Sequence, residues 1–399
     1  MPFFDTLAQF PDDPIMNLPI VFAADQRLKK VNLGLGSYKD ANGKSYILNC
    51  VKNAEKALLT KEHSKDYLPI DGDPVYNRSA MELIFSAALI ASLTGCISTV
   101  QTVGGTSALR LGGEFLCHEV SKTIFLPKPT WPNHKLVFTS CGMKIHQYRY
   151  YDETAHRLDF AGMCQDVSEM PPGSTILLHV CCQNPTGMDL SPDQWKELSL
   201  LIKKQKIIPF FDFAYQGFKA SLDDDAFALR HFASQGHEML VASSFAKNFG
   251  LYGERAGTLS LLTQHPESSR KASSQLRQMI RSNYSNPPRH GAAIIAEILN
   301  SDPLKKEWIT ELGNMRERLA EMRRSLISGL QAKGSSKDWS FLNKQSGFFS
   351  FIGLTEGQVH QLIKDYAVYM PSNGRINVAG LNGQNIDYVI EAILDVSQT

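Results

Sequence analysis

A reactive amine is predicted in the segment Val241–Leu251, which contains Lys247. A lysine held among apolar neighbours is poorly solvated in its charged form, so its pKa falls and its amine becomes a usable nucleophile. Ser244 and Arg255 lie close by in the sequence, and a hydroxyl with a guanidinium suits a phosphate group. Most lysines face solvent, so Lys247 alone is weak evidence. Together with Ser244 and Arg255, it indicates a nucleophile beside a phosphate.

A buried carboxylate is predicted at Asp212, near the end of the apolar run Ile207–Phe213. A carboxylate without a partner is costly to bury or takes up a proton, so Asp212 requires a cation or a hydrogen-bond donor. The flanking aromatic residues argue against a capped turn on the surface, which is the common alternative. Tyr215 follows three residues later and is able to present its hydroxyl to the same crevice.

Two turns offer further hydrogen-bond donors. Gly105 and Thr106 precede a helical run to about His118, and glycines let the backbone approach an anion at a helix N-terminus. Asn184 follows a buried run and opens a turn through Gly187, where its amide can donate to a ligand oxygen. An ordinary tight turn also explains each segment, so both interpretations stay open here.

Two arginines and one tryptophan complete the candidates. Arg281 precedes the segment Asn283–Pro288, and Arg375 lies in Asn373–Asn377; each guanidinium can bind a carboxylate through two parallel hydrogen bonds. Trp131 is either a core residue or a flat surface on which a planar ligand stacks. None of the three is informative without the other candidates.

Seven short apolar runs must position these residues. They are Ser98–Thr102, Thr123–Leu126, Lys144–Tyr150, Thr175–Cys182, Ile207–Phe213, Leu240–Phe245 and Thr258–Leu262. Their alternation with helical stretches predicts strands buried on both faces of a mainly parallel sheet between helices. Ligands of such α/β sheets lie beyond the carboxyl ends of the strands. Several of the candidate residues come at or just after the ends of these runs. After Pro287 we expect helices at Gly291–Asn300 and Pro303–Gln331, then a short strand-and-helix tail.

Composition excludes several classes of protein. With 41 Lys plus Arg against 40 Asp plus Glu, the net charge of +1 provides no overall field for nucleic acid or an anionic membrane. The longest apolar runs fall well short of the ~20 residues that span a bilayer. The start of the chain has no basic region before an apolar stretch, so we expect no secretion signal.

The cysteine pattern points to a reducing compartment. Seven cysteines, with no CxxC pair, argue against a disulfide framework or a zinc site. The eleven histidines include no metal-binding motif, so no metal is expected. We therefore expect a cytoplasmic protein.

Taken together, the candidates match the needs of pyridoxal phosphate: a nucleophilic lysine, partners for a ring nitrogen and a ring oxygen, a stacking face and a phosphate cradle. At this point the chain clearly resembles the class I aminotransferases, in the aspartate and aromatic-amino-acid branch. The resemblance runs from Asp13 to the tail, with motifs in the family's order. They are Gly34–Tyr38, Tyr67–Gly72, Asn184–Gly187, Asp212–Tyr215 and Ser244–Lys247.

The resemblance implies roles for the catalytic residues. Lys247 is similar to the lysine that binds the cofactor covalently and then carries a proton between the substrate's Cα and the cofactor. Asp212 is similar to the partner of the ring nitrogen, with His134 and His179 behind it. Tyr215, with Asn184, would hold the ring oxygen.

Other residues would complete the cofactor site. Trp131 would stack on the ring, and a separate group would bind the phosphate. That group is Gly105, Thr106, Ser244, Arg255 and, from the neighbouring subunit, Tyr67.

The substrate side of the site follows from the same resemblance. Arg375 is similar to the clamp for the α-carboxylate, and Arg281 to an arginine that reaches from the other subunit to a side-chain carboxylate. Gly36, Trp131 and Asn184 would also contact substrate. Residues that cross subunits imply a homodimer with shared active sites, with the arm around Phe3–Pro14 wrapped on the partner or forming an ordinary surface strand.

The predicted enzyme is an aspartate aminotransferase, which exchanges an amino group between L-aspartate and 2-oxoglutarate. The alternative is an aromatic-amino-acid aminotransferase that acts on tyrosine or phenylalanine. Its implied fold is type I of the pyridoxal-phosphate enzymes, in two closely packed domains. Residues 45–310 would form the large domain, 311–399 the small α/β domain, and 1–44 the arm and part of the small domain.

Three positions depart from the family's usual pattern or leave preference open. Ala246 stands where many relatives have a serine, and Gln183 where a histidine often precedes the Asn-Pro-Thr-Gly turn. These departures put rate and cofactor affinity in doubt more than the activity itself. Ser37, near the substrate entrance, leaves side-chain preference open.

Overall fold

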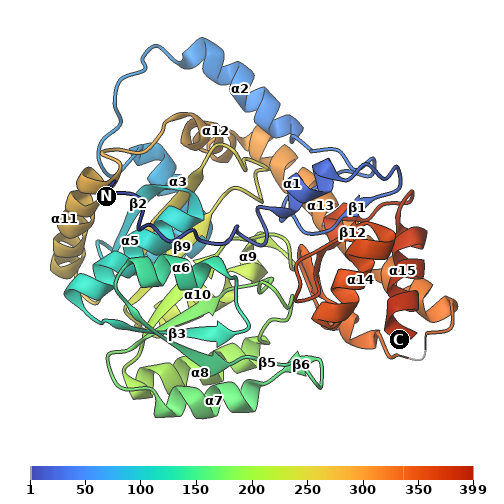
Figure 1. Cartoon of the computed structure of the whole chain (residues 1–399). Helices are drawn as coiled ribbons and strands as arrows, with labels where there is room; N and C mark the ends of the chain where they lie inside the picture. The colour runs from blue at the N-terminus through green and yellow to red at the C-terminus, as the bar shows by residue number, and fades with distance from the viewer. Residues whose placement is uncertain (1, 336, 399) are drawn as a thin grey trace.

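A seven-stranded sheet between helices forms the centre of the computed structural model, which describes residues 2–335 and 337–398 (Figure 1). From one edge to the other, the strands are β2 (Ile97–Val103), β10 (Ala256–Leu262), β9 (Met239–Ser244), β8 (Ile208–Phe213), β7 (Thr175–His179), β3 (Thr123–Lys128) and β4 (Lys144–Arg149). β10 runs antiparallel to both of its neighbours, and the five strands from β9 to β4 are parallel. The predicted mainly parallel sheet is confirmed.

One strand differs from the sequence-based expectation. The run Lys144–Tyr150 was expected to be buried on both faces, but β4 is the edge strand and most of its side chains are exposed. Since β4 pairs with β3 alone, its polar residues can face solvent. In contrast, every residue of β7, β9 and β10 is buried.

Helices cover both faces of the sheet. Apolar residues of α5 (Gly104–Glu119), α6 (Asn133–Ser140) and α11 (Pro266–Asn283) pack on one face. The other core includes residues of α2 (Asn49–Lys61), α3 (Pro74–Phe85), α7 (Phe160–Glu169), α8 (Pro192–Gln205), α10 (Phe227–Ser234), α12 (His290–Leu299) and α13 (Asp302–Ala332). Two short helices, α4 (Ala87–Ser92) and α9 (Leu222–Asp225), and a hairpin of β5 (Tyr151–Asp152) and β6 (Arg157–Leu158) lie in the connections. The two predicted helices after Pro287 correspond to α12 and α13.

Both ends of the chain build a smaller second part (Figure 1). β1 (Val31–Asn32) pairs in parallel with β12 (Val368–Tyr369), and β11 (Phe349–Phe351) pairs antiparallel with β13 (Arg375–Asn377). The helices α14 (Glu356–Tyr366) and α15 (Ile386–Gln398) and the short 3-10 helices Ser340–Lys344 and Val378–Gly380 complete it. The expected boundary at 310/311 falls within the unbroken helix α13, and the division into domains stays a prediction.

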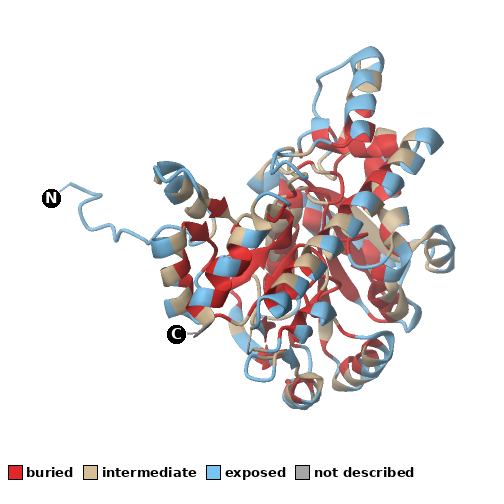
Figure 2. Ribbon diagram, turned by 90° about the vertical axis from the view of Figure 1, so that its right-hand side faces the viewer, coloured by how far each residue is buried: buried red, intermediate tan, exposed pale blue. Residues whose placement is uncertain are grey.

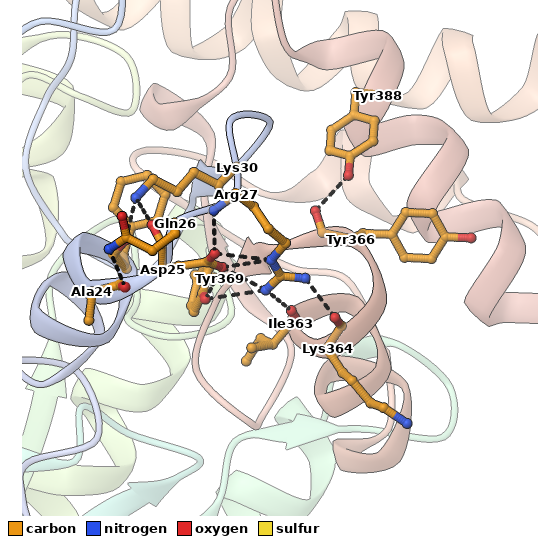
Figure 3. A network of polar contacts seen from close by, with 11 residues as sticks. Ala24, Asp25, Gln26, Arg27, Lys30, Ile363, Lys364, Tyr366, Tyr369 and Tyr388 are labelled. Carbon is orange, nitrogen blue, oxygen red and sulfur yellow. Dashed lines mark hydrogen bonds and ion pairs between the residues drawn. The ribbon is translucent and has the colours of Figure 1, made fainter.

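Polar contacts fasten the N-terminal segment to this smaller part (Figure 3). Arg27 binds the carboxylate of Asp25 and donates to the carbonyl oxygens of Ile363 and Lys364 at 2.9 and 2.6 Å. The Tyr369 hydroxyl donates to Asp25 Oδ2 at 2.6 Å. Both carbonyls belong to the last turn of α14, and that of Ile363 also accepts the N–H of Ala367, so Arg27 fixes the chain after α1 (Leu18–Ala24) on the C-terminal end of α14.

The arm before α1 projects from the body of the molecule (Figure 2). Its apolar side chains are exposed in the single chain, with 95% of Phe3 and 85% of Phe10 accessible. Exposed apolar side chains in series are characteristic of contact surfaces. Within the described ranges, no helix has the length and apolarity needed to cross a membrane.

Candidate active site

A cavity of about 670 Å³ lies at the carboxyl ends of the sheet strands, as the fold class predicts. Twelve of the predicted site residues line it: Gly36, Gly105, Thr106, Trp131, His179, Asn184, Asp212, Tyr215, Ser244, Lys247, Arg255 and Arg375. They come from widely separated segments of the chain. The structure therefore brings most of the predicted site together.

An anion cradle forms one end of the cavity. α5 begins at Gly104 directly after β2, so its free N–H groups and positive dipole face the cavity. A Cβ on Gly104 would lie 2.5 Å from Arg255 Nη2, and one on Gly105 would lie 2.8 Å from Ser244 Cβ. The two glycines thus permit a guanidinium and a hydroxyl to approach the helix N-terminus, an arrangement suited to phosphate.

Asp212 stands in β8 with its carboxylate directed at a histidine. His134 Nε2 lies 2.9 Å from Asp212 Oδ2, and the His134 ring is fully buried. Burial alone would raise the pKa of Asp212, but the hydrogen bond with His134 and the nearby Lys247 hold it below the ordinary value. Asp212 is therefore an anion that can accept a hydrogen bond from a protonated nitrogen of a ligand in the cavity.

Thr130, which the sequence analysis did not single out, connects the two histidines. Its Oγ1 lies 2.8 Å from His134 Nδ1 and 3.2 Å from His179 Nε2. Burial lowers the pKa of His179 to about 3, so its ring is neutral at neutral pH. Possible ligand atoms of His134, His179 and Asp212 lie within 4.8 Å of one another, as in a metal site. Both ring nitrogens of His134 are already in hydrogen bonds, so the geometry is that of a hydrogen-bonded chain behind Asp212.

Lys247 is held in the loop after β9. Trp308 of α13 stacks on Phe249 at 4.4 Å and donates to the carbonyl oxygen of Asn248 at 2.7 Å. Lys247 Nζ lies 5.2 Å from the centre of the Tyr215 ring. Burial lowers the pKa of Lys247 and outweighs the opposing charge of Asp212, so the amine loses its proton more readily than a surface lysine.

Tyr215 and Asn184 stand near this amine with different chemical capacities. Burial raises the pKa of Tyr215, so its phenol stays protonated and can donate a hydrogen bond. Asn184 is buried, and its Oδ1 accepts from Arg375 Nη1 at 3.2 Å. Its amide nitrogen is thereby oriented away from that arginine, since a carboxamide carries its donor and acceptor on opposite branches.

Arg375 is a buried cation with an unused donor. Its Nη2 donates to the carbonyl oxygen of Gly34 at 2.6 Å, and its guanidinium carbon lies 4.1 Å from the centre of the Phe349 ring. Arg375 Nε is buried and has no hydrogen-bond partner among the described residues. Burial lowers the pKa of Arg375 to about 10, which leaves it charged at neutral pH. A carboxylate in the cavity would satisfy the unused donor.

Three predicted site residues are not in the lining of this cavity: His134, which lies behind Asp212, and Tyr67 and Arg281. Tyr67 is 89% exposed and lines a second cavity of about 470 Å³ with Tyr284 and Pro287. Arg281, near the end of α11, is exposed and donates to Ser285 Oγ. Neither Tyr67 nor Arg281 contributes to the main cavity of its own chain, and their contribution to a second subunit stays a prediction.

The cavity fits a planar ring that carries a phosphate. The anion cradle, the anionic Asp212 and the amine of Lys247 lie around the same cavity, with Trp131 in its lining. Pyridoxal phosphate has a phosphate, a basic ring nitrogen and an aldehyde that reacts with amines. Each of its groups has a chemically suitable partner here.

Comparisons with known proteins agree with this geometry. The family model described as aminotransferase class I and II matches residues 28–393. The aspartate aminotransferase of Escherichia coli is 45% identical over 394 residues, 98% of this chain and 100% of that protein. Mitochondrial aspartate aminotransferase of Gallus gallus is 44% identical over 97% of this chain and 92% of its own length.

Among solved structures, the aromatic-amino-acid aminotransferase of Burkholderia pseudomallei, covalently bound to pyridoxal phosphate, has a TM-score of 0.96. It is 42% identical and covers 99% of this chain and 100% of that chain.

Proposed function

Because the chain belongs to the class I and II aminotransferases, we propose that it is an aspartate aminotransferase. It transfers an amino group from L-aspartate to 2-oxoglutarate and gives oxaloacetate and L-glutamate. The observation that carries the aminotransferase assignment is the buried Arg375, which lines the same cavity as Lys247 and Asp212 and whose Nε has no hydrogen-bond partner among the described residues. Curated relatives named aspartate aminotransferase, identical at about 44% over nearly the whole chain, favour aspartate as the substrate.

The enzyme is a transaminase that depends on pyridoxal phosphate. When bound, this group supplies an electron-withdrawing ring that stabilises the negative charge left on the substrate's Cα. We assign the anion cradle to its phosphate, Asp212 to its ring nitrogen, and Tyr215 with Asn184 to its ring oxygen. Trp131 is assigned to one face of the ring.

Lys247 moves the proton in each half-reaction. Its lowered pKa lets the neutral amine accept the proton from the substrate's Cα and return it at the cofactor's C4′. Asp212, held anionic by His134, would stabilise a positive charge on the ring nitrogen of the bound cofactor.

Arg375 binds the α-carboxylate, which every amino-acid substrate has. We assign the side-chain carboxylate of aspartate to Arg281 of the partner subunit, because Arg281 lies outside the main cavity of its own chain. The protein is then a homodimer with shared sites. The exposed apolar side chains of the arm, Phe3 and Phe10 among them, support this assignment because association would remove them from water.

A second candidate is an aromatic-amino-acid aminotransferase. It is favoured by the TM-score of 0.96 with an enzyme of that name and by apolar side chains in the cavity lining, Ile15, Leu35 and Phe349. In both cases the substrates are small amino and 2-oxo acids.

We propose that the protein is cytoplasmic, because its seven cysteines include no CxxC pair and this pattern is typical of a reducing compartment.

The half-reaction with a single amino acid tests the proposal. The purified protein, loaded with pyridoxal phosphate, is mixed with L-aspartate or L-phenylalanine and no oxo acid, and its visible absorption is recorded. We expect conversion to the pyridoxamine form with both, at a much lower concentration of aspartate. The reverse ranking would establish the aromatic candidate, and a protein that binds no pyridoxal phosphate would contradict both.

A further inference from the structure

Gln183 lies buried between two loops of the active site. It follows β7, and it is 0% exposed. On one side is the loop after β3, which begins at Pro129; on the other is its own turn, which continues to Gly187. β3 and β7 are neighbours in the sheet, so the two loops leave the same edge side by side.

The carboxamide of Gln183 joins the two loops. Its Nε2 donates to the carbonyl oxygen of Pro129 at 2.8 Å. Its Oε1 accepts from the backbone N–H of Thr186 at 2.9 Å and from Thr186 Oγ1 at 2.5 Å. Because the N–H of Thr186 can only donate, the oxygen of the carboxamide must face Thr186 and the nitrogen must face Pro129.

Each loop carries one contact of the cofactor ring. Trp131 comes two residues after Pro129 and lines the cavity, with its ring edge-on to His134 at 5.2 Å. Asn184 comes directly after Gln183 and lines the same cavity. We propose that Gln183 is a positioning residue that fixes the spacing between Trp131 and Asn184. Through this spacing it sets the position in which the cofactor ring binds. This inference rests on the proposed pyridoxal-phosphate function.

A carboxamide suits this place because it is neutral and offers a donor and an acceptor at every pH. A carboxylate would place a second acceptor against the Pro129 carbonyl, and a protonated imidazole would place a second donor against the Thr186 N–H. Leucine would leave the polar groups of Pro129 and Thr186 buried without this partner.

Titratable groups lie on both sides of Gln183. Asp189 Oδ1 accepts its backbone N–H at 3.0 Å, and Lys219 lies 3.4 Å from the other oxygen of Asp189. Toward β3 the titratable groups are His134 and His179, both bonded to Thr130. These groups shift the pH at which an introduced acid or imidazole titrates, but they leave the wild-type carboxamide neutral.

The first test compares the affinity of the apo-protein for pyridoxal phosphate in two matched variants, measured by equilibrium dialysis. Gln183→Leu should weaken binding at least about tenfold, equal to ~1.4 kcal/mol. Gln101→Leu is the control: Gln101 is 1% exposed and joins two other segments through Asp73 N and the Pro288 oxygen at 3.0 and 2.7 Å. It should lose similar thermal stability yet bind within about twofold of wild type, because none of these residues lines the main cavity.

Two further variants give opposite pH signatures. Affinity relative to wild type should fall with rising pH in Gln183→Glu, because ionisation removes the donor to Pro129. In Gln183→His it should fall with decreasing pH, because protonation removes the acceptor for Thr186. The sign should therefore reverse between the two variants, and the comparison with Gln101→Leu at similar thermal stability separates a positioning role from a merely structural one.

The outcomes separate this inference from the function on which it rests. Equal affinity losses in the two leucine variants, or the same pH trend in the glutamate and histidine variants, would overturn the role of Gln183 alone. Wild-type affinity in Gln183→Leu would do the same. A wild-type protein that fails to bind pyridoxal phosphate would overturn both proposals.

Discussion

The inner wall and the outer rim of the active site are built in opposite ways. Asp212, Lys247 and Arg375 on the inner wall line one cavity of a single chain, and Arg375 is buried. At the rim, the predicted contributors Tyr67 and Arg281 are exposed and lie outside that cavity. The residues of the inner wall come from one chain, and we propose that a second chain completes the rim.

This difference has a physical reason. The inner groups depend on altered proton affinity, which burial produces and water abolishes, so they must fold together with the core. An arginine that recognises a charged side chain needs no such shift and can arrive from another subunit. The contrast teaches that chemistry and substrate choice are separable in this molecule, and substitutions should separate them.

The largest effect is expected for Lys247→Ala. Without the amine, the covalent link and the proton transfer at Cα are both lost, so kcat should fall by at least about 10⁴-fold with every amino acid. Steady-state assays with aspartate and phenylalanine measure this. The circular dichroism spectrum should be unchanged, and near-normal turnover would remove Lys247 from the inner wall.

Arg375→Leu should have the next largest effect. The α-carboxylate would lose its charged partner, so kcat/KM should fall by roughly 10³-fold for aspartate and phenylalanine alike. Equal losses would place Arg375 with the inner wall, as the account expects. A loss confined to aspartate would instead assign it to the side-chain carboxylate.

Arg281→Leu should discriminate between substrates. The kcat/KM for aspartate should fall by about 100-fold, and the value for phenylalanine should fall by less than about tenfold, because only aspartate has a second carboxylate. The ratio of the two constants is the quantity to report. An unchanged ratio would mean that Arg281 plays no part in recognition.

The smallest effect is expected in the pH dependence of the free energy of unfolding, through His179 in the inner wall. The pKa of His179 is about 3 in the folded chain against 6.5 for an ordinary histidine. Between these values the unfolded chain binds more protons, so the free energy of unfolding should fall as pH drops below 6.5, by up to ~1.4 kcal/mol per pH unit. Urea unfolding at several pH values should show a shallower dependence in His179→Asn; an identical slope would exclude His179 as its source.

The sheet and the inner wall could be predicted from the sequence because their signals are local. Buried runs such as β7 and β8 are continuous in the chain, and Asp212 marks the end of one of them. The exposure of β4 could not be predicted, since edge position depends on which strand it pairs with.

Other features depend on contacts between distant residues. Pairing of Val31 with Val368 involves two-residue strands that have no periodicity to detect. Thr130 is an ordinary threonine in the sequence, and its importance comes from hydrogen bonds to His134 and His179, the latter 49 residues away. A resemblance to the family predicts site residues, but it does not predict such hydrogen bonds between distant residues.

Subunit mixing tests the separation of inner wall and rim most directly. Lys247→Ala and Arg281→Leu proteins are unfolded together, refolded as an equal mixture, and assayed with aspartate. If Arg281 serves the partner's site, each hybrid dimer contains one intact site, and random pairing should restore about one quarter of wild-type activity. Activity no higher than the average of the two parents would contradict the account and place Lys247 and Arg281 in the same chain's site.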